Sequence, residues 1–194
     1  FTTVRVVDAY PNALLTKYFW SDCAFTKIGG RWPTLGEIYK KLKNRSGQSS
    51  NDWNFTLLAD PALTMDYPEH IIIIDSINQS GINNQKDTIK ALNKVRFSGH
   101  IEDIQGQRLN NFNGSILPIV YDKPSMFNTL SNDLPDEPIP FQLYSSILYK
   151  GENTVTNGLY SFSFVVPKDI NYNFGFGKIS MYAKNGVTDA NGHF

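Results

Sequence analysis

The sequence has one cysteine, Cys23, among its 194 residues. A single thiol excludes internal disulfides and any zinc site built from several cysteines, and it is compatible with every cellular compartment. Long apolar runs are missing too. The longest stretches, such as 71–74, are far shorter than a bilayer span, so the sequence predicts no transmembrane helix.

The sequence also has no excess of charge. Its 18 basic residues balance 18 acidic ones, and the basic residues are not concentrated in one segment. Such a chain has little electrostatic attraction for nucleic acid or for an anionic membrane, so we expect neither partner. The first residue is Phe1, and no charged and apolar leader precedes the predicted fold, so we expect an excerpt of a longer protein.

The composition changes along the chain. Helical patterns occupy the first part, whereas the rest is rich in Val, Ile, Phe, Tyr and Thr. This second part carries four Asn-Gly pairs, a dipeptide typical of tight turns between strands, at 113–114, 157–158, 185–186 and 191–192. The length allows two small domains. We predict units at 1–68 and 69–194, joined near Pro68, which disfavours helix at the residue before it.

The sequence of the first unit predicts an α/β layer. A β-branched run predicts a buried strand over 2–7, followed by a helix over 12–20. Thr34 and Glu37 match a capping box at the start of a helix over 35–44. Asp60 and Pro61 suit the N-cap and first position of a last helix.

The second unit is predicted to be all-β. Tyr160, Phe162, Phe164 and Val166 alternate with more polar residues, which predicts a strand with one buried face, and Asn157-Gly158 predicts a type I′ turn before it. Pro118 should lie in an edge strand or at a bulge. About seven strands suggest an immunoglobulin-like β-sandwich. We predict strands over 70–75, 95–101, 115–121, 141–149, 153–156, 159–166 and 178–183.

Several segments of the chain match one known family. In the second unit they are Val155–Ile170, Gly177–Ala183, Asp189–Gly192, Phe112–Gly114 and Tyr121–Lys123. In the first unit they are Thr3, Arg5, Val6, Val7, Gly36, Glu37, Leu58 and Asp60–Leu63. Together these segments resemble the type IX secretion sortases, cysteine peptidases of the gingipain family. Ala59 departs from the family, which usually has glycine there, and this affects only local loop geometry.

The resemblance implies an α+β chain: the C-terminal piece of a caspase-like α/β catalytic domain, then an immunoglobulin-like sandwich. It implies a parent endopeptidase at the cell surface, associated with the outer membrane, that removes C-terminal signals from secreted cargo. Cargo and type IX secretion components would be its partners. Family members can also transfer cargo to a lipopolysaccharide anchor. In the family the catalytic cysteine and histidine lie upstream of the first strand. This chain would then hold no catalytic, cofactor or metal residue and would be inactive alone.

The candidates for chemistry in the chain itself are few. Cys23 follows a predicted helix and matches no nucleophile motif, so we interpret it as a structural thiol. A cysteine nucleophile would need one of the three histidines beside it. His100 lies in an alternating strand and should have a solvent or backbone partner. His70 falls at the domain junction and His193 at the chain end, and neither has a flanking ligand pattern.

Metal and modification signals are weak. The run 189–192 has the opening spacing of a calcium loop without its closing glutamate, so we predict an Asx-type turn. The acidic loop 132–138 fits an exposed connector, and we expect no ion there. Asn-x-Ser/Thr triplets, which arise by chance in an Asn-rich chain, begin at Asn44, Asn54, Asn78 and Asn113.

Two alternative functions remain open, and two surface features are candidate contacts. The chain could be a non-enzymatic surface binding module with an immunoglobulin-like domain, or belong to a different gingipain-family peptidase, which the Val166–Ile170 run makes less attractive. If a surface patch contacts a partner, we choose the rings of Tyr172, Phe174 and Phe176, which sit among glycines and asparagines. The strand 2–7 should expose an unpaired edge, which favours a homodimer.

Overall fold

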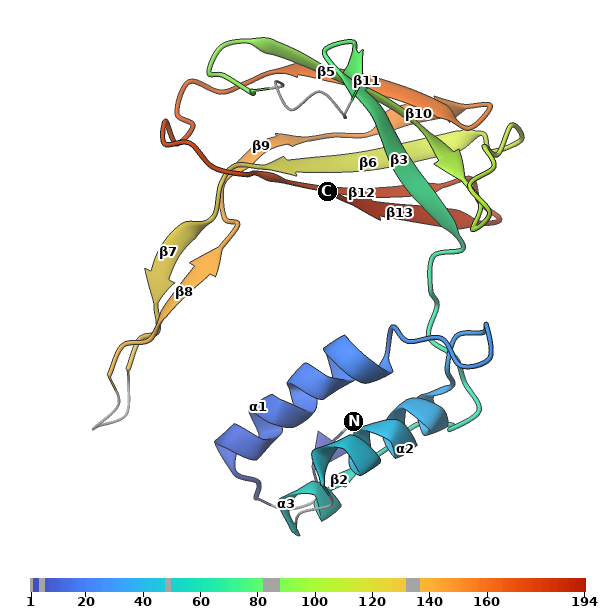
Figure 1. The fold of residues 1–194 in the computed structure, drawn as a ribbon, viewed down its shortest axis with the longest axis vertical. Helices are drawn as coiled ribbons and strands as arrows, with labels where there is room; N and C mark the ends of the chain where they lie inside the picture. The colour runs from blue at the N-terminus through green and yellow to red at the C-terminus, as the bar shows by residue number, and fades with distance from the viewer. Residues whose placement is uncertain (1, 4–5, 48–49, 82–87, 132–136) are drawn as a thin grey trace. The chain divides into compact units, whose positions relative to one another are not determined.

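A computed structural model describes residues 2–3, 6–47, 50–81, 88–131 and 137–194 (Figure 1). Its contacts divide the chain into two compact units, Phe1–Tyr67 and Pro68–Phe194. The smaller unit contains β1 (Thr2–Thr3), α1 (Ala9–Tyr18), a π-helical turn η1 (Phe19–Cys23), α2 (Leu35–Ser46), α3 (Ser50–Trp53) and β2 (Phe55–Thr56).

The larger unit is all-β in its described residues, as predicted. Its strands are β3 (His70–Ile77), β4 (Ser80–Gly81), β5 (Lys94–Glu102), β6 (Gly114–Tyr121), β7 (Ser125–Asn128), β8 (Pro140–Leu143), β9 (Ile147–Lys150), β10 (Asn153–Thr156), β11 (Leu159–Val165), β12 (Lys178–Lys184) and β13 (Asp189–His193). No described helix of the chain is both long enough and apolar enough to cross a bilayer.

The capping box of α2 is confirmed. The Thr34 hydroxyl accepts a hydrogen bond from the Glu37 N–H at 3.3 Å, and the Glu37 carboxylate accepts one from the Thr34 N–H at 2.9 Å. Each side chain therefore satisfies a backbone donor that the helix leaves open. The helix stops at Gly47, whose φ of +86° is the left-handed conformation that glycine adopts without strain.

Two predictions for the smaller unit need correction. Strand occurs only at Thr2–Thr3 within the predicted 2–7, of which 4–5 lie outside the described residues. Val6 is 95% exposed, and the side chains of Asn54 and Asn51 bond the backbone of Val6 and Asp8 in place of a neighbouring strand. Asp60 begins a turn rather than a helix, because its carboxylate accepts the N–H of Ala62 two residues on.

The core of the smaller unit is compact. It consists of Leu15, Cys23, Ala24, Ile38 and Leu42, from α1, η1, the residue after η1 and α2. The helix predicted over 12–20 begins at Ala9 and ends at Tyr18, and η1 carries the chain on to the buried Cys23. Burial of these apolar side chains holds the helices together.

The strands of the larger unit close into a ring. Hydrogen-bonded neighbours run β10, β11, β5, β3, β13, β12 and β6, and β10 pairs again with β6. We expected an immunoglobulin-like sandwich of two separate sheets. The structure instead has one sheet that closes on itself, because Val155 of β10 lies opposite Tyr160 of β11 on one side and opposite Gly114 of β6 on the other.

The predicted β10–β11 hairpin is confirmed. Asn157 and Gly158 have φ of +52° and +73°, the two positive values of a type I′ turn. A Cβ on Gly158 would meet the Leu109 carbonyl oxygen at 2.3 Å, so glycine is also required by close approach. Tyr160, Phe162, Phe164 and Val166 are buried, as their alternation predicted.

Two predictions about strands are wrong. Residues 189–192 form strand β13, not an Asx turn; the Asx turn lies just before, where Asn185 Oδ1 accepts the N–H groups of Val187 and Thr188. The segment 141–149 is broken into β8 and β9, and β8 pairs with β7 in a separate two-stranded arm. The prediction for Pro118 is confirmed in its second alternative: β6 is not an edge strand, but its register against β9 shifts between Val120 and Tyr121. The missing N–H of Pro118 faces the break between β9 and β10.

We predict that Phe97→Ala destabilises the larger unit by about 3–5 kcal/mol. Phe97 is fully buried and stacks on Phe162 and Phe164, with ring centroids 5.1 and 6.2 Å apart. Urea unfolding, monitored by circular dichroism, measures the decrease in the free energy of unfolding. The matched variant Phe174→Ala, at a fully exposed ring, should change stability by less than about 0.5 kcal/mol. Equal effects of the two variants would contradict the assigned core.

We also predict an acid-sensitive capping box. Hydrogen bonds from Arg31 and then from the Thr34 backbone lower the pKa of Glu37 to about 2 from an ordinary 4.5. A lowered folded-state pKa stabilises the fold fully above about pH 4.5, and this contribution is lost as the pH falls toward 2. Thermal melts should show that Glu37→Gln removes part of the acid dependence, whereas Glu152→Gln, at an exposed carboxylate, retains it.

Candidate functional site

The one thiol is buried in the smaller unit. Cys23 is 1% exposed and packs with Leu15, Ile38 and Leu42. Burial raises the pKa of the Cys23 thiol, so the reactive thiolate is disfavoured. His70, His100 and His193 all belong to the other unit. The smaller unit therefore has no imidazole of its own to take a proton from this thiol.

His100 lies between two carboxylates on the outer side of the closed sheet. Its Nδ1 is 2.9 Å from Asp75 and its Nε2 is 3.3 Å from Glu102. The β3–β5 register shifts between Ile74 and Ser76, so Asp75 is the extra residue of a bulge, and a bulge re-aims a side chain. The predicted solvent or backbone partner is therefore wrong, because the two ring nitrogens face side-chain carboxylates. The bulge that brings Asp75 to His100 depends on the pairing of β3 with β5 and was not evident from local sequence.

Serines of β3, β5 and the neighbouring β11 lie on the strands around His100 and are candidates for a serine nucleophile. Ser76 and Ser98 are hydrogen-bonded to each other at 2.7 Å, and Ser161 accepts from Arg96 at 3.0 Å. Both imidazole nitrogens of His100 already face carboxylates, so neither is left to act as a base toward a hydroxyl. The arrangement is a carboxylate–imidazole–carboxylate cluster rather than a catalytic triad.

The remaining sequence candidates are not brought together. His70 begins β3 with its ring edge against Phe112, and His193 ends β13 opposite Ser180. Asp189 accepts the Glu69 N–H at 3.3 Å. Across the described part of the chain, no three His, Cys, Asp or Glu side chains cluster closely enough to hold a metal ion. Residues 132–136 of the acidic loop lie outside the described residues.

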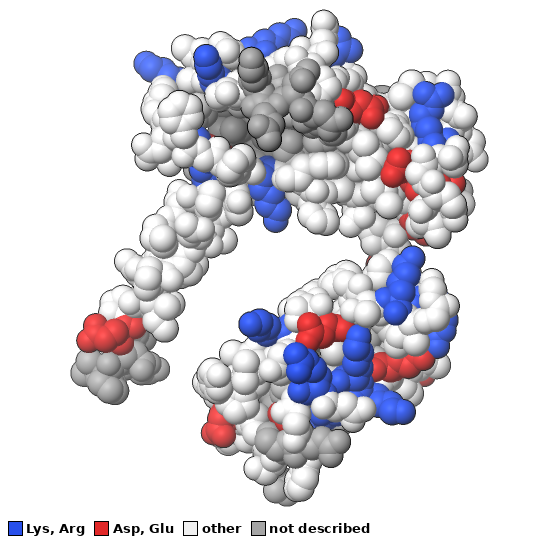
Figure 2. Space-filling model, viewed as in Figure 1, with Lys and Arg blue, Asp and Glu red and all other residues white. Residues whose placement is uncertain are grey.

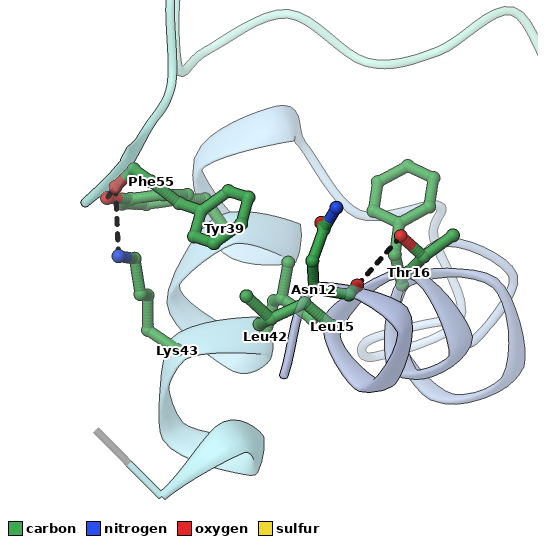
Figure 3. Close-up of a pocket in the computed structure, with 8 residues that line it drawn as sticks. Asn12, Leu15, Thr16, Tyr39, Leu42, Lys43 and Phe55 are labelled. Atoms are coloured by element: carbon green, nitrogen blue, oxygen red, sulfur yellow. Dashed lines mark hydrogen bonds between the residues drawn. The ribbon is translucent and has the colours of Figure 1, made fainter. Parts of the chain in front are cut away.

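A cavity of about 220 Å³ separates α1 from α2 in the smaller unit (Figure 3). Three of its polar side chains are already engaged. Lys43 Nζ and the Tyr39 hydroxyl both donate to the Phe55 carbonyl at 2.9 Å, and Thr16 donates to the Asn12 carbonyl at 3.0 Å. The walls are otherwise apolar, from Leu15, Phe19, Leu42 and Phe55. The cavity offers packing surface but no free acid, base or nucleophile.

The aromatic patch chosen from the sequence lies in the loop between β11 and β12. Tyr172, Phe174 and Phe176 are 74%, 100% and 92% exposed. Phe174 and Phe176 line a hollow of about 390 Å³ together with Lys123, Pro124 and Tyr144. Exposed rings around a hollow are typical of a contact surface. This patch is the strongest candidate site in the described residues.

Asp122 fixes the loop next to this hollow. The carboxylate is 5% exposed and accepts the Asn171 N–H at 2.7 Å and the Lys123 Nζ at 2.8 Å. Burial by itself would raise the pKa of Asp122, but the bonds from Lys123 and Asn171 outweigh it and hold the pKa below its usual range. The sequence signal for this anchor was only the Tyr121–Lys123 match, and it did not reveal that Lys123 and Tyr144 would join the patch.

One comparison with solved structures bears on the whole chain. The crystal structure of dimeric latent PorU from Porphyromonas gingivalis matches with a TM-score of 0.58 and 30% sequence identity over 88% of the chain. This chain is similar to part of PorU. It spans 16% of the PorU chain, so the likeness concerns one region of a much larger protein.

Other comparisons add little. Spo0M, a sporulation control protein from Bacillus subtilis, matches 65% of this chain and 46% of its own, with 16% identity and a TM-score of 0.31. No family model and no curated protein matches the chain.

We predict that Cys23 is unreactive in the folded chain. Its buried, largely protonated thiol should react with iodoacetamide far more slowly at pH 8 than the same thiol in 6 M urea, because only the thiolate is nucleophilic. Mass spectrometry of timed samples measures the ratio. Labelling of the folded chain at a rate close to that in urea would show that the thiol is accessible. Cys23 would then again be a candidate nucleophile.

Proposed function

We propose that this chain is part of a type IX secretion sortase of the PorU type, a cysteine endopeptidase of the gingipain family that removes C-terminal signals from secreted cargo. The observation that carries the proposal is the similarity to PorU, at 30% identity over 88% of the chain. It agrees with the resemblance found independently in the Val155–Ile170 run and in the Asp60–Leu63 motif.

In this proposal the smaller unit, 1–68, is the C-terminal end of a caspase-like catalytic domain. The larger unit, 69–194, is a supporting β domain. The chain itself contributes no nucleophile or base and is inactive alone. Two features support this assignment: Cys23 is buried in a unit without histidine, and both nitrogens of His100 face carboxylates. The apolar cavity beside α1 would suit packing against other parts of the catalytic domain.

The proposal also assigns location and partners. The parent protein acts at the cell surface in association with the outer membrane, where it meets secreted cargo and other type IX secretion components. A second copy is a further proposed partner, since PorU is dimeric in its crystal structure. The sequence points to the edge at 2–7 as the contact. The two paired residues of β1 make that edge short.

A binding module without catalytic activity is the second candidate. The observation in its favour is the ring cluster of Tyr172, Phe174 and Phe176, since exposed aromatic side chains often anchor a partner. The two candidates differ in one respect. A binding module keeps its cargo intact, whereas a sortase shortens it.

The test uses cells that carry the complete gene. Deletion of the gene should leave secreted cargo with its C-terminal signal attached, which intact-mass spectrometry detects. Complementation with the unaltered gene should restore processing. Complementation with Cys23→Ser should restore it to the same extent, because Cys23 is proposed to have no catalytic role.

Two results would overturn the proposal. Normal processing of cargo in the deletion strain would exclude a sortase role for the gene. Hydrolysis of a cargo-derived peptide by the purified 194-residue chain, abolished by Cys23→Ser, would show that the nucleophile lies inside the chain. Cargo that is bound by the purified chain and never shortened in cells would favour the binding module.

A further inference from the structure

The outer edge of β11 is covered along only part of its length. β10 pairs with it at Leu159 and Tyr160, and this pairing closes the ring. Beyond Tyr160, no strand of the described residues pairs with this side of β11. Figure 1 shows β11 continuing beside β5, whereas β9, which precedes β10, follows β6. The closure therefore removes the open edge of β11 only as far as Tyr160.

The register identifies the backbone groups on this free edge. The Ile101 N–H donates to the Gly158 carbonyl at 2.8 Å. Because the direction of hydrogen bonding alternates along an antiparallel strand, the even-numbered residues of β11 bond β5 and the odd-numbered ones face away from it. The N–H and C=O groups of Ser163 and Val165 consequently point to the free edge. Within the described residues, no backbone group is bonded to them.

The free edge of β11 lacks the residues that protect two other edges of the larger unit. β8 begins with Pro140 and β9 ends with Lys150, and both proline and lysine discourage the addition of a strand. From Leu159 to Val165, β11 contains neither proline nor charge. Its outward side chains are small or apolar, so they leave the backbone groups accessible. This edge is therefore open to a further strand.

A strand added to this edge would also cover apolar surface. Side chains alternate along a strand, so every second residue of the added strand would point to the interior of the sheet. There the rings of Tyr149 and Phe164 stack with centroids 4.8 Å apart, and Tyr149 is only half-buried. Apolar side chains at the inward positions would extend this packing and remove apolar surface from water.

The outer face beside the free edge is basic. Lys94 and Arg96 of β5 are exposed, and they lie opposite Val165 and Ser163, respectively. Figure 2 shows basic side chains over the part of the larger unit that contains β5 and β11. The Arg96 Nε donates to the Ser161 hydroxyl at 3.0 Å, so its side chain extends across β11 toward the free edge. Acidic side chains on the outer face of an added strand would complement these charges.

We propose that the free edge of β11, at 161–165, binds an extended segment of another protein as an additional β-strand. The segment alternates apolar residues, which face Tyr149 and Phe164, with acidic residues, which face Lys94 and Arg96. Backbone hydrogen bonds along the edge supply affinity, and the two kinds of side chain select the sequence. The inference does not depend on the proposed peptidase assignment.

The experiment uses a short blocked peptide that alternates valine and glutamate and carries a fluorescent label. Anisotropy titration with the 194-residue chain measures the dissociation constant, and hydrogen exchange followed by NMR reports on single amides. The amides of Ser163 and Val165 should exchange rapidly in the free chain and become protected when the peptide binds. A peptide with lysine in place of glutamate should bind at least about tenfold more weakly, because its charges repel the basic face.

Two variants of one residue test the backbone contact. Ser163→Pro removes a donor from the free edge, whereas Ser163→Ala keeps it. Both should retain the closed sheet, which circular dichroism checks, because the Ser163 N–H does not bond β5 and proline is tolerated at such positions. The proline variant should bind the valine–glutamate peptide at least about tenfold more weakly, and the alanine variant should bind it like the unaltered chain. A peptide methylated at the backbone nitrogens that face β11 should also bind weakly to the unaltered chain.

Several results would overturn the inference. Equal affinities of the proline and alanine variants, or undiminished binding of the methylated peptide, would show that the edge makes no backbone contact. Absence of binding by the valine–glutamate peptide, or slow exchange of the Ser163 and Val165 amides in the free chain, would show that the edge is closed to a partner. Protection that rises with protein concentration would assign the edge to a second copy instead. None of these results bears on the cargo-processing test.

Discussion

The double pairing of β10 is the constraint on which the larger unit depends. This four-residue strand hydrogen-bonds β11 on one side and β6 on the other, and so turns a curved sheet into a closed one. Gly114, which lies opposite Val155 at the closure, also lies close to β12: a Cβ there would meet the Lys184 carbonyl oxygen at 2.1 Å, so only glycine lets β6 approach β12 this closely. Closure removes open edges from the ring, and inside it the rings of Phe97, Phe162, Phe164 and Tyr149 stack into a continuous core.

The candidate functional surfaces of this closed sheet lie on its outer face and in the segments that connect its strands. The Asp75–His100–Glu102 cluster lies on the outer face, where a bulge creates it. The aromatic loop and the arm lie in connections, and Asp122 links them because it binds both Asn171 and Lys123. This arrangement suits a scaffold that presents contact surfaces.

The smaller unit is stabilised differently. It has a modest core around Leu15 and Ile38, and its fold relies on polar anchors at particular points. The capping box fixes the start of α2, the Tyr67 hydroxyl donates to the Ala24 carbonyl, and Asn51 and Asn54 hold the segment before α1. A cavity lined by apolar side chains remains beside the core. Such a unit is consistent with the end of a larger domain, which is the role proposed for it.

The sequence alone determined the features that depend on residues a few positions apart. Thr34 and Glu37 meet within one helical turn, Asn157-Gly158 makes its own reversal, and the alternation from Tyr160 to Val166 fixes which face of β11 is buried. The sequence also favoured the rings at 172–176 as the contact patch, because glycines and asparagines separate them, and their exposure came from the structure. Only the tertiary structure decided the closure, the bulge at Asp75, the site of Pro118 and the pairing of β13 beside β3. Ala190 lies opposite His70, and Val155 opposite Gly114, so these outcomes rest on backbone hydrogen bonds between residues far apart in the chain. Local propensity does not encode such partners; they are selected by which arrangement buries the most apolar surface while leaving the fewest backbone groups unpaired.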